Sequence, residues 1–241
     1  MPPVSVVDEF MSSLLLGHRV ACRAFVEKTL ESFGDTMRVY HELVWPAMER
    51  VDKMYRADRI NTAVEHMATR INRCIADQLQ PRLPYAARNG KRIVITCADD
   101  EPEELGAQMC ADLFESRGWE VFFLGGGVPN DEILTLIGQL TPNVLLIFGT
   151  QPQGVPGVRQ LVDTVREIGV NPTMNVMVSG GVFNRADGLW KEVNAEFFAR
   201  NAQQALDLAD AAEPRTAPPP KPGAPKKRRR RRREPVLVAT E

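Results

Sequence analysis

The pattern that most constrains the fold begins at Arg92, where short runs of β-branched residues alternate with segments of helical periodicity. Parallel strands need a crossover of about a dozen residues, and a helix follows each of these runs, so the strands are expected to pair in parallel. The fold class predicted over residues 92–212 is α/β, an open, doubly wound parallel sheet. Strands are predicted at residues 92–97, 120–124, 143–148, 175–179 and, weakly, 195–199, with helices at 105–117, 131–140, 157–168 and 202–211.

A helical region, residues 1–83, precedes this pattern. Glycine is scarce there, and apolar residues recur at three- and four-residue spacing, which is typical of amphipathic helices. Helices are predicted at residues 4–16, 20–33, 36–55 and 61–79. Asp35 and Asn61 are the predicted N-caps, and Pro46 is expected to kink the third helix. Short connections favour an antiparallel four-helix bundle, joined to the sheet by a linker at residues 84–91.

The C-terminal segment, residues 213–241, differs in composition from the rest of the chain. Residues 211–241 carry ten Lys or Arg and three Glu, a net charge of +7, whereas the remainder carries twenty basic and twenty-eight acidic residues, a net charge of -8. Proline and like charges cannot bury enough apolar surface to fold, so a disordered tail is predicted. Its eight consecutive cations, Lys226 to Arg233, suit the phosphates of RNA or DNA or an anionic membrane surface, and equally suit a solvated tail that aids solubility.

Other features narrow the class of protein. The N-terminus lacks a basic-then-apolar signal pattern, and no apolar run approaches the about 20 residues that span a bilayer, so a cytoplasmic protein is expected. The four scattered cysteines are expected to be reduced thiols. With three histidines, no metal-ligand cluster and no Ser-His-Asp or Cys-His set can be placed on one face, which argues against an enzyme. A homo-oligomer is among the partner classes that the sequence allows.

Four predicted loops lie where ligands bind in parallel α/β folds, outside the carboxyl ends of the strands. They span residues 98–105, 125–129, 149–154 and 179–183. Glycines in three of them either let backbone approach a large ligand or close tight strand-helix turns. No GxGxxG opens a helix and no GxxxxGK is present, so neither a dinucleotide site nor a phosphate loop is predicted.

The first of these loops carries Glu101, Glu103 and Gly106 at the spacing of Asp-x-His-x-x-Gly. Its strand-loop-helix setting resembles the first unit of the cobalamin (vitamin B12)-binding domain family, a Rossmann-like fold. In that family the histidine of the motif is the lower axial ligand of cobalt. Here the glycine is kept, the acid is Glu101, and Glu103 replaces the histidine.

The remaining loops extend the resemblance over residues 92–211. LGGGVPNDEI, which contains Gly125, is similar to the family's turn after the second strand. VSGGVF, which contains Gly180 and Gly181, is similar to its Gly-Gly turn after the fourth strand, where the cofactor's lower nucleotide tail passes close to backbone. The third loop departs from the family's Ser-x-Leu, because the sequence there is GTQ. The hydroxyl of Thr150 lies one residue after the position of the family's serine.

The helical region resembles, over residues 12–79, the caps of methionine-synthase-like and light-sensing cobalamin proteins. Those caps carry a Trp followed ten residues later by Glu-His, facing the upper side of the corrin. The matching residues are Tyr55, Glu65 and His66 in YRADRINTAVEHMATRI, and His66 is the candidate metal ligand. Taken alone, a Glu-His pair on a helix is also typical of a partly buried histidine that a neighbour satisfies.

The exchange of histidine for Glu103 shapes the expected function. A carboxylate is a weaker partner than imidazole for a cobalt corrinoid. Five acids within positions 99–104 also favour an exposed, solvated loop that caps a helix N-terminus. The resemblance therefore implies a non-enzymatic sensor or regulatory module that binds cobalamin without a lower histidine ligand. The predicted cofactor contacts are Tyr55, Glu65, His66, Glu101, Glu103, Gly106, Gly125, Thr150, Gly180 and Gly181.

Three alternatives are compatible with the same residues. The pocket is adapted to another tetrapyrrole such as haem, with His66 on the metal. The chain is a corrinoid carrier subunit for a separate methyltransferase. Or the fold has lost its cofactor and serves as a scaffold that binds nucleic acid or protein through the polybasic tail.

Overall fold

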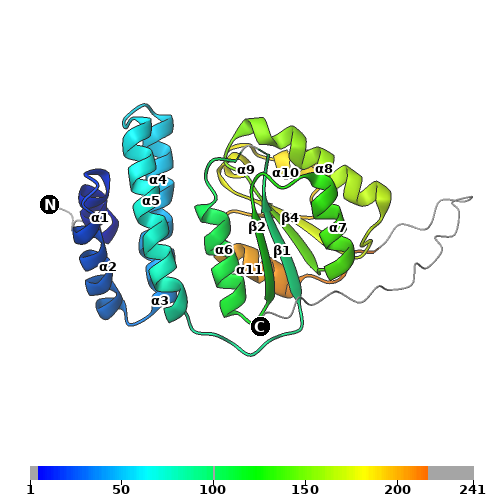
Figure 1. The fold of residues 1–241 in the computed structure, drawn as a ribbon, viewed down its shortest axis with the longest axis horizontal. Coiled ribbons are helices and arrows are strands. Elements are labelled where there is room, and N and C mark those ends of the chain that lie inside the picture. Colours follow the sequence, from blue (N-terminus) through cyan, green and yellow to red (C-terminus); the bar gives the residue numbers. More distant parts are fainter. Residues whose placement is uncertain (1–4, 100, 217–241) are drawn as a thin grey trace, which may run out of the picture.

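The computed structural model describes residues 5–99 and 101–216, and it places a helical bundle beside an α/β domain (Figure 1). The predicted fold class is confirmed, because a helical region is followed by a five-stranded parallel sheet. Most of the predicted tail, including Lys226 to Arg233, lies outside the described residues. In the described part of the chain, no helix combines the length and the apolar character needed to cross a membrane.

The bundle contains the four predicted helical stretches. The predicted N-caps are confirmed, since Asp35 accepts a hydrogen bond from the Met37 amide and Asn61 from the Val64 amide. The second helix ends at Gly34 in the left-handed conformation, which glycine adopts without steric cost. The elements are α1 (Val6–Leu15), α2 (Arg19–Phe33), α3 (Thr36–Val39), the π-helical turn η1 (Tyr40–Val44), α4 (Trp45–Arg56) and α5 (Thr62–Leu79).

The predicted third helix is three contiguous pieces, α3, η1 and α4, with a π-helical turn directly before Pro46. Proline has no amide hydrogen, so a regular helix through it loses one backbone bond. In the turn before the proline, the Trp45 amide donates to the carbonyl of Tyr40, five residues earlier, whereas a regular α-helix would use the carbonyl four residues earlier. One additional residue in a helical turn shifts the phase of the following side chains by about 100°. The irregular turn therefore decides which face α4 presents to the sheet.

The sheet has the strand order β2-β1-β3-β4-β5, with every pair parallel. This is the flavodoxin-like order of doubly wound folds. The strands are β1 (Arg92–Cys97), β2 (Glu120–Gly125), β3 (Val144–Phe148), β4 (Asn175–Ser179) and β5 (Phe197–Ala199). The remaining elements are η2 (Gln80–Arg82), α6 (Leu105–Ser116), α7 (Asn130–Leu140), η3 (Pro152–Gly154), α8 (Val155–Ile168), α9 (Gly181–Arg185), α10 (Leu189–Glu192) and α11 (Ala202–Ala211).

Helices cover both faces of the sheet, with α6 and α11 on the side of the bundle and α7 and α8 on the other (Figure 1). The bundle shares one buried apolar cluster with α6, α11 and the adjacent face of the sheet. The opposite face packs with α7 and α8 into a second cluster. The bundle is thus packed against the sheet domain through apolar surface, besides being connected to it by the chain.

Several local predictions differ from the structure. The last strand begins at Phe197 rather than at residue 195, and the short helices α9 and α10 were not predicted, because four or five residues carry no readable periodicity. Helix α7 begins at Asn130, one residue before the predicted start, and its N-cap is Pro129. The four cysteines are free thiols, as predicted.

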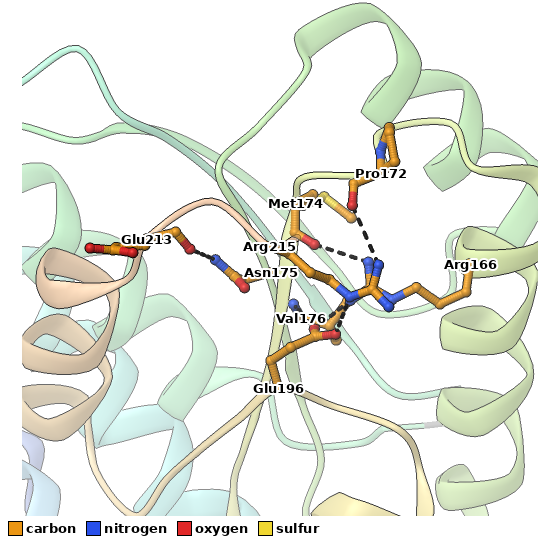
Figure 2. A network of polar contacts seen from close by, with 8 residues as sticks. All are labelled: Arg166, Pro172, Met174, Asn175, Val176, Glu196, Glu213 and Arg215. Atoms are coloured by element: carbon orange, nitrogen blue, oxygen red, sulfur yellow. Dashed lines mark hydrogen bonds and ion pairs between the residues drawn. The ribbon is translucent and has the colours of Figure 1, made fainter. Parts of the chain in front are cut away.

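The last described residues are fastened to the amino-terminal edge of the sheet (Figure 2). The Glu196 carboxylate accepts hydrogen bonds from the guanidinium groups of Arg166 and Arg215 and from a backbone amide of β4. The side chain of Asn175 donates to the carbonyl oxygen of Glu213 at 2.8 Å. Residues 213–215, which composition assigns to the tail, therefore contact the α/β domain.

Candidate functional site

The strand order brings the loops after β1 and β3 next to each other. β1 lies between β2 and β3, so the chain leaves β1 and β3 in opposite directions along the sheet. A crevice opens at the carboxyl ends of two such strands, and it is where ligands bind in open α/β folds. The loop after β4 adjoins it, because β4 is the other neighbour of β3.

A cavity of about 220 Å³ lies between the bundle and this edge of the sheet. It is lined by residues of the bundle and of the α/β domain, which are far apart in the sequence. Glu101 and Gly125, both predicted contacts, do not line it. The other eight predicted contacts do: Tyr55, Glu65 and His66 from the bundle, and Glu103, Gly106, Thr150, Gly180 and Gly181 from the α/β domain.

The bundle side of the cavity presents a buried carboxylate next to an exposed imidazole, both on α5. Glu65 is 7% exposed, and its Oε1 accepts a hydrogen bond from the Thr69 hydroxyl at 3.1 Å. Its Oε2 lies 3.5 Å from Nε2 of His66. The His66 side chain is 53% exposed, so the ring has room to change rotamer and present a nitrogen to a ligand. The Tyr55 hydroxyl lies 3.2 Å from that of Thr62.

Glu101 is held in place by the loop after β3. It is 8% exposed, and its carboxylate accepts hydrogen bonds from both the amide and the hydroxyl of Thr150. It also accepts one from the Glu103 amide at 3.2 Å. A carboxylate removed from water requires such partners. The predicted exposed, solvated loop is therefore wrong for Glu101, and Glu104, the N-cap residue of α6, makes no side-chain cap bond.

Gly125 does not line the cavity and lies instead next to the carboxylate of Glu104. Oε1 of Glu104 accepts a hydrogen bond from the Gly126 amide at 2.6 Å, and the other carboxylate oxygen lies 3.6 Å from Arg73 of α5. A Cβ atom at Gly125 would approach Oε1 of Glu104 to 2.8 Å. Glycine at this position therefore lets the carboxylate tie the loop after β2 to α6 and to the bundle.

Glu103 stands at the position of the missing histidine and is half-buried at the cavity. The pKa of Glu103 is raised to about 7, mainly by burial and next by the negative charge of Glu65 on the bundle side, and Arg70 and Arg73 oppose this increase. Near neutral pH the group is therefore partly protonated. A protonated carboxyl can donate a hydrogen bond, but it is a poor metal ligand.

Two glycines bring the loops into direct contact. Gly180 has a φ of 105°, and a Cβ atom there would lie 2.2 Å from the carbonyl oxygen of Gly149, so only glycine fits. A Cβ atom at Gly106 would lie 2.2 Å from the ring of Phe148. Phe148 is 3% exposed, and its ring therefore fills the space beneath the first turn of α6.

Comparison with known proteins assigns both parts of the chain to one family. A family model of the B12 binding domain matches residues 91–206, and a second B12 binding domain model matches residues 6–80. The chain belongs to the B12-binding domain family.

The similarity of this B12-binding protein to curated relatives extends over most of its length. It is 19% identical over 209 residues to dimethylamine corrinoid protein 1 of Methanosarcina acetivorans, covering 86% of this chain and 96% of that protein. It is 21% identical over 204 residues to dimethylamine corrinoid protein 2 of Methanosarcina mazei, covering 83% and 94%. The structure of the Methanosarcina barkeri monomethylamine corrinoid protein matches with a TM-score of 0.76 at 16% identity, covering 85% and 96%, which shows a shared fold.

The residues of this B12-binding protein fit a corrinoid better on the bundle side than on the sheet side. The bundle offers an imidazole at the rim of the cavity, whereas the sheet side offers the carboxyl group of Glu103 and the ring of Phe148. The cavity is also smaller than the about 300–1,000 Å³ of pockets that bury drug-sized ligands. A macrocycle is therefore larger than the space this cavity offers, and the lining side chains or the bundle must move to admit it. Among the described residues, no three His, Cys, Asp or Glu side chains are grouped to hold a bare metal ion. His66, which lines the cavity, is the candidate axial contact.

Sequence reasoning missed residues on both sides of the cavity. Five of them lie on α4, among them Trp45, whose indole donates to Glu49 at 2.9 Å, and Asp52, which pairs with Arg56 at 2.8 Å. Their orientation depends on the π-helical turn, which a regular helix through residues 36–55 does not include. The only sequence signal for that turn is Pro46. The lining residues not predicted are Trp45, Met48, Glu49, Val51, Asp52, Thr69, Pro102, Phe148, Gln151 and Asn184.

Proposed function

We propose that this chain is a non-enzymatic, corrinoid-binding sensor or regulatory module that holds its ligand between the bundle and the sheet without a lower imidazole. The observation that carries the proposal is that residues of both domains converge on one cavity, with His66 above and Glu103 below. Because two domains form the cavity, a large ligand changes how they pack. A partner can read that change, since the ligand favours one of two packing states.

The polar contacts around the cavity oppose domain separation only weakly. Asp52 on α4 lies 3.8 Å from Arg185 on α9, and Arg73 on α5 lies 3.6 Å from Glu104. All four side chains are about one-third exposed, and partly solvated pairs of this kind contribute roughly 0–1 kcal/mol each. Ligand binding can therefore shift the packing of the bundle at modest cost in polar contacts.

The test is retention of a corrinoid by the purified full chain. The protein is incubated with hydroxocobalamin and desalted, and its visible spectrum is recorded. We expect retained corrin absorbance, and at least tenfold weaker retention after His66→Ala, because the candidate axial contact is lost. His18→Ala is the matched control, since His18 lies in the exposed turn between α1 and α2. Absence of corrin absorbance after desalting overturns the proposal.

A second candidate is a corrinoid carrier for a separate methyltransferase. It is supported by the match to proteins named dimethylamine corrinoid proteins over 94–96% of their length. Glu103 counts against it, because a carboxylate is a weaker ligand than imidazole for a cobalt corrinoid. The loaded chain, its cobalt first reduced to Co(I) by an added chemical reductant, is mixed with dimethylamine and a methyltransferase that acts with such relatives. Transfer of one methyl group from dimethylamine to Co(I), which leaves methylamine, supports the carrier, and retention without transfer supports the sensor.

Two further alternatives have their own tests. A pocket adapted to haem predicts that haemin is retained in the same desalting assay and that His66→Ala changes its spectrum. A scaffold acting through its tail predicts that deletion of Lys226 to Arg233 abolishes binding of RNA or DNA at low salt, where phosphate contacts are strongest. Unchanged nucleic-acid binding after that deletion contradicts the scaffold.

A further inference from the structure

A second hollow, the bundle groove, lies within the bundle between α1 and α4. Its volume is about 510 Å³, whereas that of the inter-domain cavity is about 220 Å³. Helix α4 stands between α1 and the α/β domain (Figure 1). The groove and the cavity therefore lie on two different faces of one helix.

The floor of the bundle groove is apolar. Helix α1 contributes Met11 and Leu15, which are one turn apart, and α4 contributes Pro46 and Met54. Met11 is 4% exposed, and the other three side chains are partly exposed. Methionine side chains are unbranched and adapt to the shape of what they pack against. A trough between two helices with such a floor suits the apolar face of a third helix.

Cations surround this floor. Lys53 and Arg59 are exposed, and within the described residues neither side chain has a hydrogen-bond or ion-pair partner. Arg50 pairs with Asp8, and both of these side chains are more than one-third exposed. The described lining carries these three cations and one carboxylate, Glu49, although residues 1–210 as a whole carry twenty basic and twenty-eight acidic residues. The rim of the groove is therefore positive on a chain whose folded part is acidic.

The charge and the shape of the groove select among occupants. The chain's own tail, Lys226 to Arg233, carries the same sign as the rim and is repelled by it. A bilayer surface takes up apolar side chains that protrude, whereas Met11 is buried at the floor of a hollow. An acidic amphipathic helix satisfies both features, because its apolar stripe fills the trough and its carboxylates meet Lys53 and Arg59.

We propose that the bundle groove binds an acidic amphipathic helix of a partner protein. The part of the groove on α4 runs from Pro46 to Ala57, which is about 16 Å of helix, so the partner contributes about three turns. Its apolar residues recur at three- and four-residue spacing, with Asp or Glu beside them.

Helix α4 connects this partner to the inter-domain cavity, and this part of the inference rests on the proposed function. Lys53 lines the groove, its neighbour Asp52 lines the cavity, and Glu49 lines both. A ligand that displaces α4 also displaces one wall of the groove, so the affinity for the partner changes. Because such coupling is reciprocal, the partner changes the affinity for the ligand by the same factor.

The test is a peptide selection on the full chain, without corrinoid. Random peptides of about 16 residues, long enough for about four helical turns, are displayed on phage and selected against the natural protein. We expect enriched sequences that place Asp or Glu beside an apolar stripe of helical spacing. Lys53→Glu together with Arg59→Glu reverses two exposed cations and leaves the apolar floor intact. It should weaken binding of the selected peptides at least about tenfold.

The control is Lys28→Glu together with Arg88→Glu, which makes the same change of net charge on α2 and on the linker, outside the groove. These two side chains are also exposed and without a partner in the described part of the chain. The Debye length at physiological salt is about 8 Å, so distant charges are screened and peptide binding should change less than about threefold. The proposal is overturned by absence of enrichment, by enriched sequences that lack acidic residues, or by equal weakening in the two double variants.

Two further measurements identify other occupants, and the polybasic tail is unchanged in both. Self-association of the natural chain that is lost in Lys53→Glu with Arg59→Glu would assign the groove to a second copy. Co-sedimentation with phosphatidylserine vesicles that is lost in the same variant would assign it to a membrane. Either result overturns the partner helix.

The link through α4 is tested with a selected peptide and the chain loaded with hydroxocobalamin. At saturating peptide, the rate of corrinoid loss should change at least about fivefold. An unchanged rate overturns the link but not the docking. Because the selection uses no corrinoid, a chain that binds peptide but retains no corrinoid overturns the proposed function alone, so the two failures are distinguishable.

Discussion

Glu101, on the loop after β1, accepts hydrogen bonds from both the backbone amide and the hydroxyl of Thr150, on the loop after β3. The two residues are 49 positions apart, and they meet because β1 and β3 are neighbours in the sheet. Two bonds to one residue fix the position of the second loop relative to the first. The floor of the inter-domain cavity is thereby set by a carboxylate that does not itself line the cavity.

Removal of the Thr150 hydroxyl should weaken this junction. Thr150→Val keeps the shape and the backbone bond but removes one of the two donors to Oε1 of a buried carboxylate, which then retains only the Glu103 amide. The expected loss in the free energy of unfolding is about 1–3 kcal/mol, measured by urea denaturation. The control is Thr135→Val on the exposed face of α7, where the hydroxyl bonds only a helix carbonyl, and it should change the free energy by less than about 0.5 kcal/mol. Equal effects of the two substitutions would mean that the Glu101 contact contributes nothing.

The raised pKa of Glu103 predicts a stability that depends on pH. The folded protein holds this proton up to about pH 7, whereas the unfolded chain releases it near 4.5. The folded state therefore binds more protons between these values, and the contribution of Glu103 to the free energy of unfolding falls as the pH rises through that window. Glu103→Gln removes the titration, so it should gain about 1–3 kcal/mol relative to the natural chain on going from pH 5 to pH 8. A constant difference across that range would contradict the prediction.

The sequence predicts the fold and eight of the eighteen residues that line the cavity, but not the contacts that hold these residues in place. His66 and Gly180 are recognisable because the motif that carries each of them lies within one helix or one turn, so a local pattern is enough. The burial of Glu101 depends on Thr150, and no local pattern carries a contact made across neighbouring strands. The orientation of Trp45 depends on one additional residue in a helical turn, and a regular 3.6-residue periodicity cannot show that. Local charge density alone indicates a solvated loop, and the error comes from partners that lie far away in the chain.

Gly180 and Gly127 form a matched pair for testing close approach between the loops. Both have positive φ, 105° and 72°, but a Cβ atom at Gly127 meets nothing within 4 Å, whereas one at Gly180 meets the carbonyl of Gly149. Gly127→Ala should therefore cost only the conformational penalty of about 1–2 kcal/mol. Gly180→Ala should cost at least about 3 kcal/mol, because the loops must also move apart. Denaturation midpoints of the two variants provide the comparison, and similar midpoints would exclude a steric role for Gly149.

The contacts of residues 213–215 can be isolated by comparing two truncations. A chain ending at Thr216 keeps the bonds of Arg215 to Glu196 and of Asn175 to the Glu213 carbonyl, and a chain ending at Ala212 loses both. Loss of these bonds, one of them charge-assisted, should lower the free energy of unfolding by about 1–3 kcal/mol. Equal stability of the two truncated proteins would show that the C-terminal contacts are not stabilising.

Glu103→His tests whether a single exchange separates this site from one with a lower imidazole ligand. The side chain at position 103 faces the cavity, and a neutral imidazole is a better ligand than a partly protonated carboxyl group for a cobalt corrinoid. We expect at least tenfold slower loss of bound hydroxocobalamin and a visible spectrum that differs from that of the natural chain. Gln151→His is the control, because it adds an imidazole to the same cavity from the loop after β3. The idea fails if the two variants behave alike, since that would make the added imidazole, rather than its position in the loop after β1, the cause.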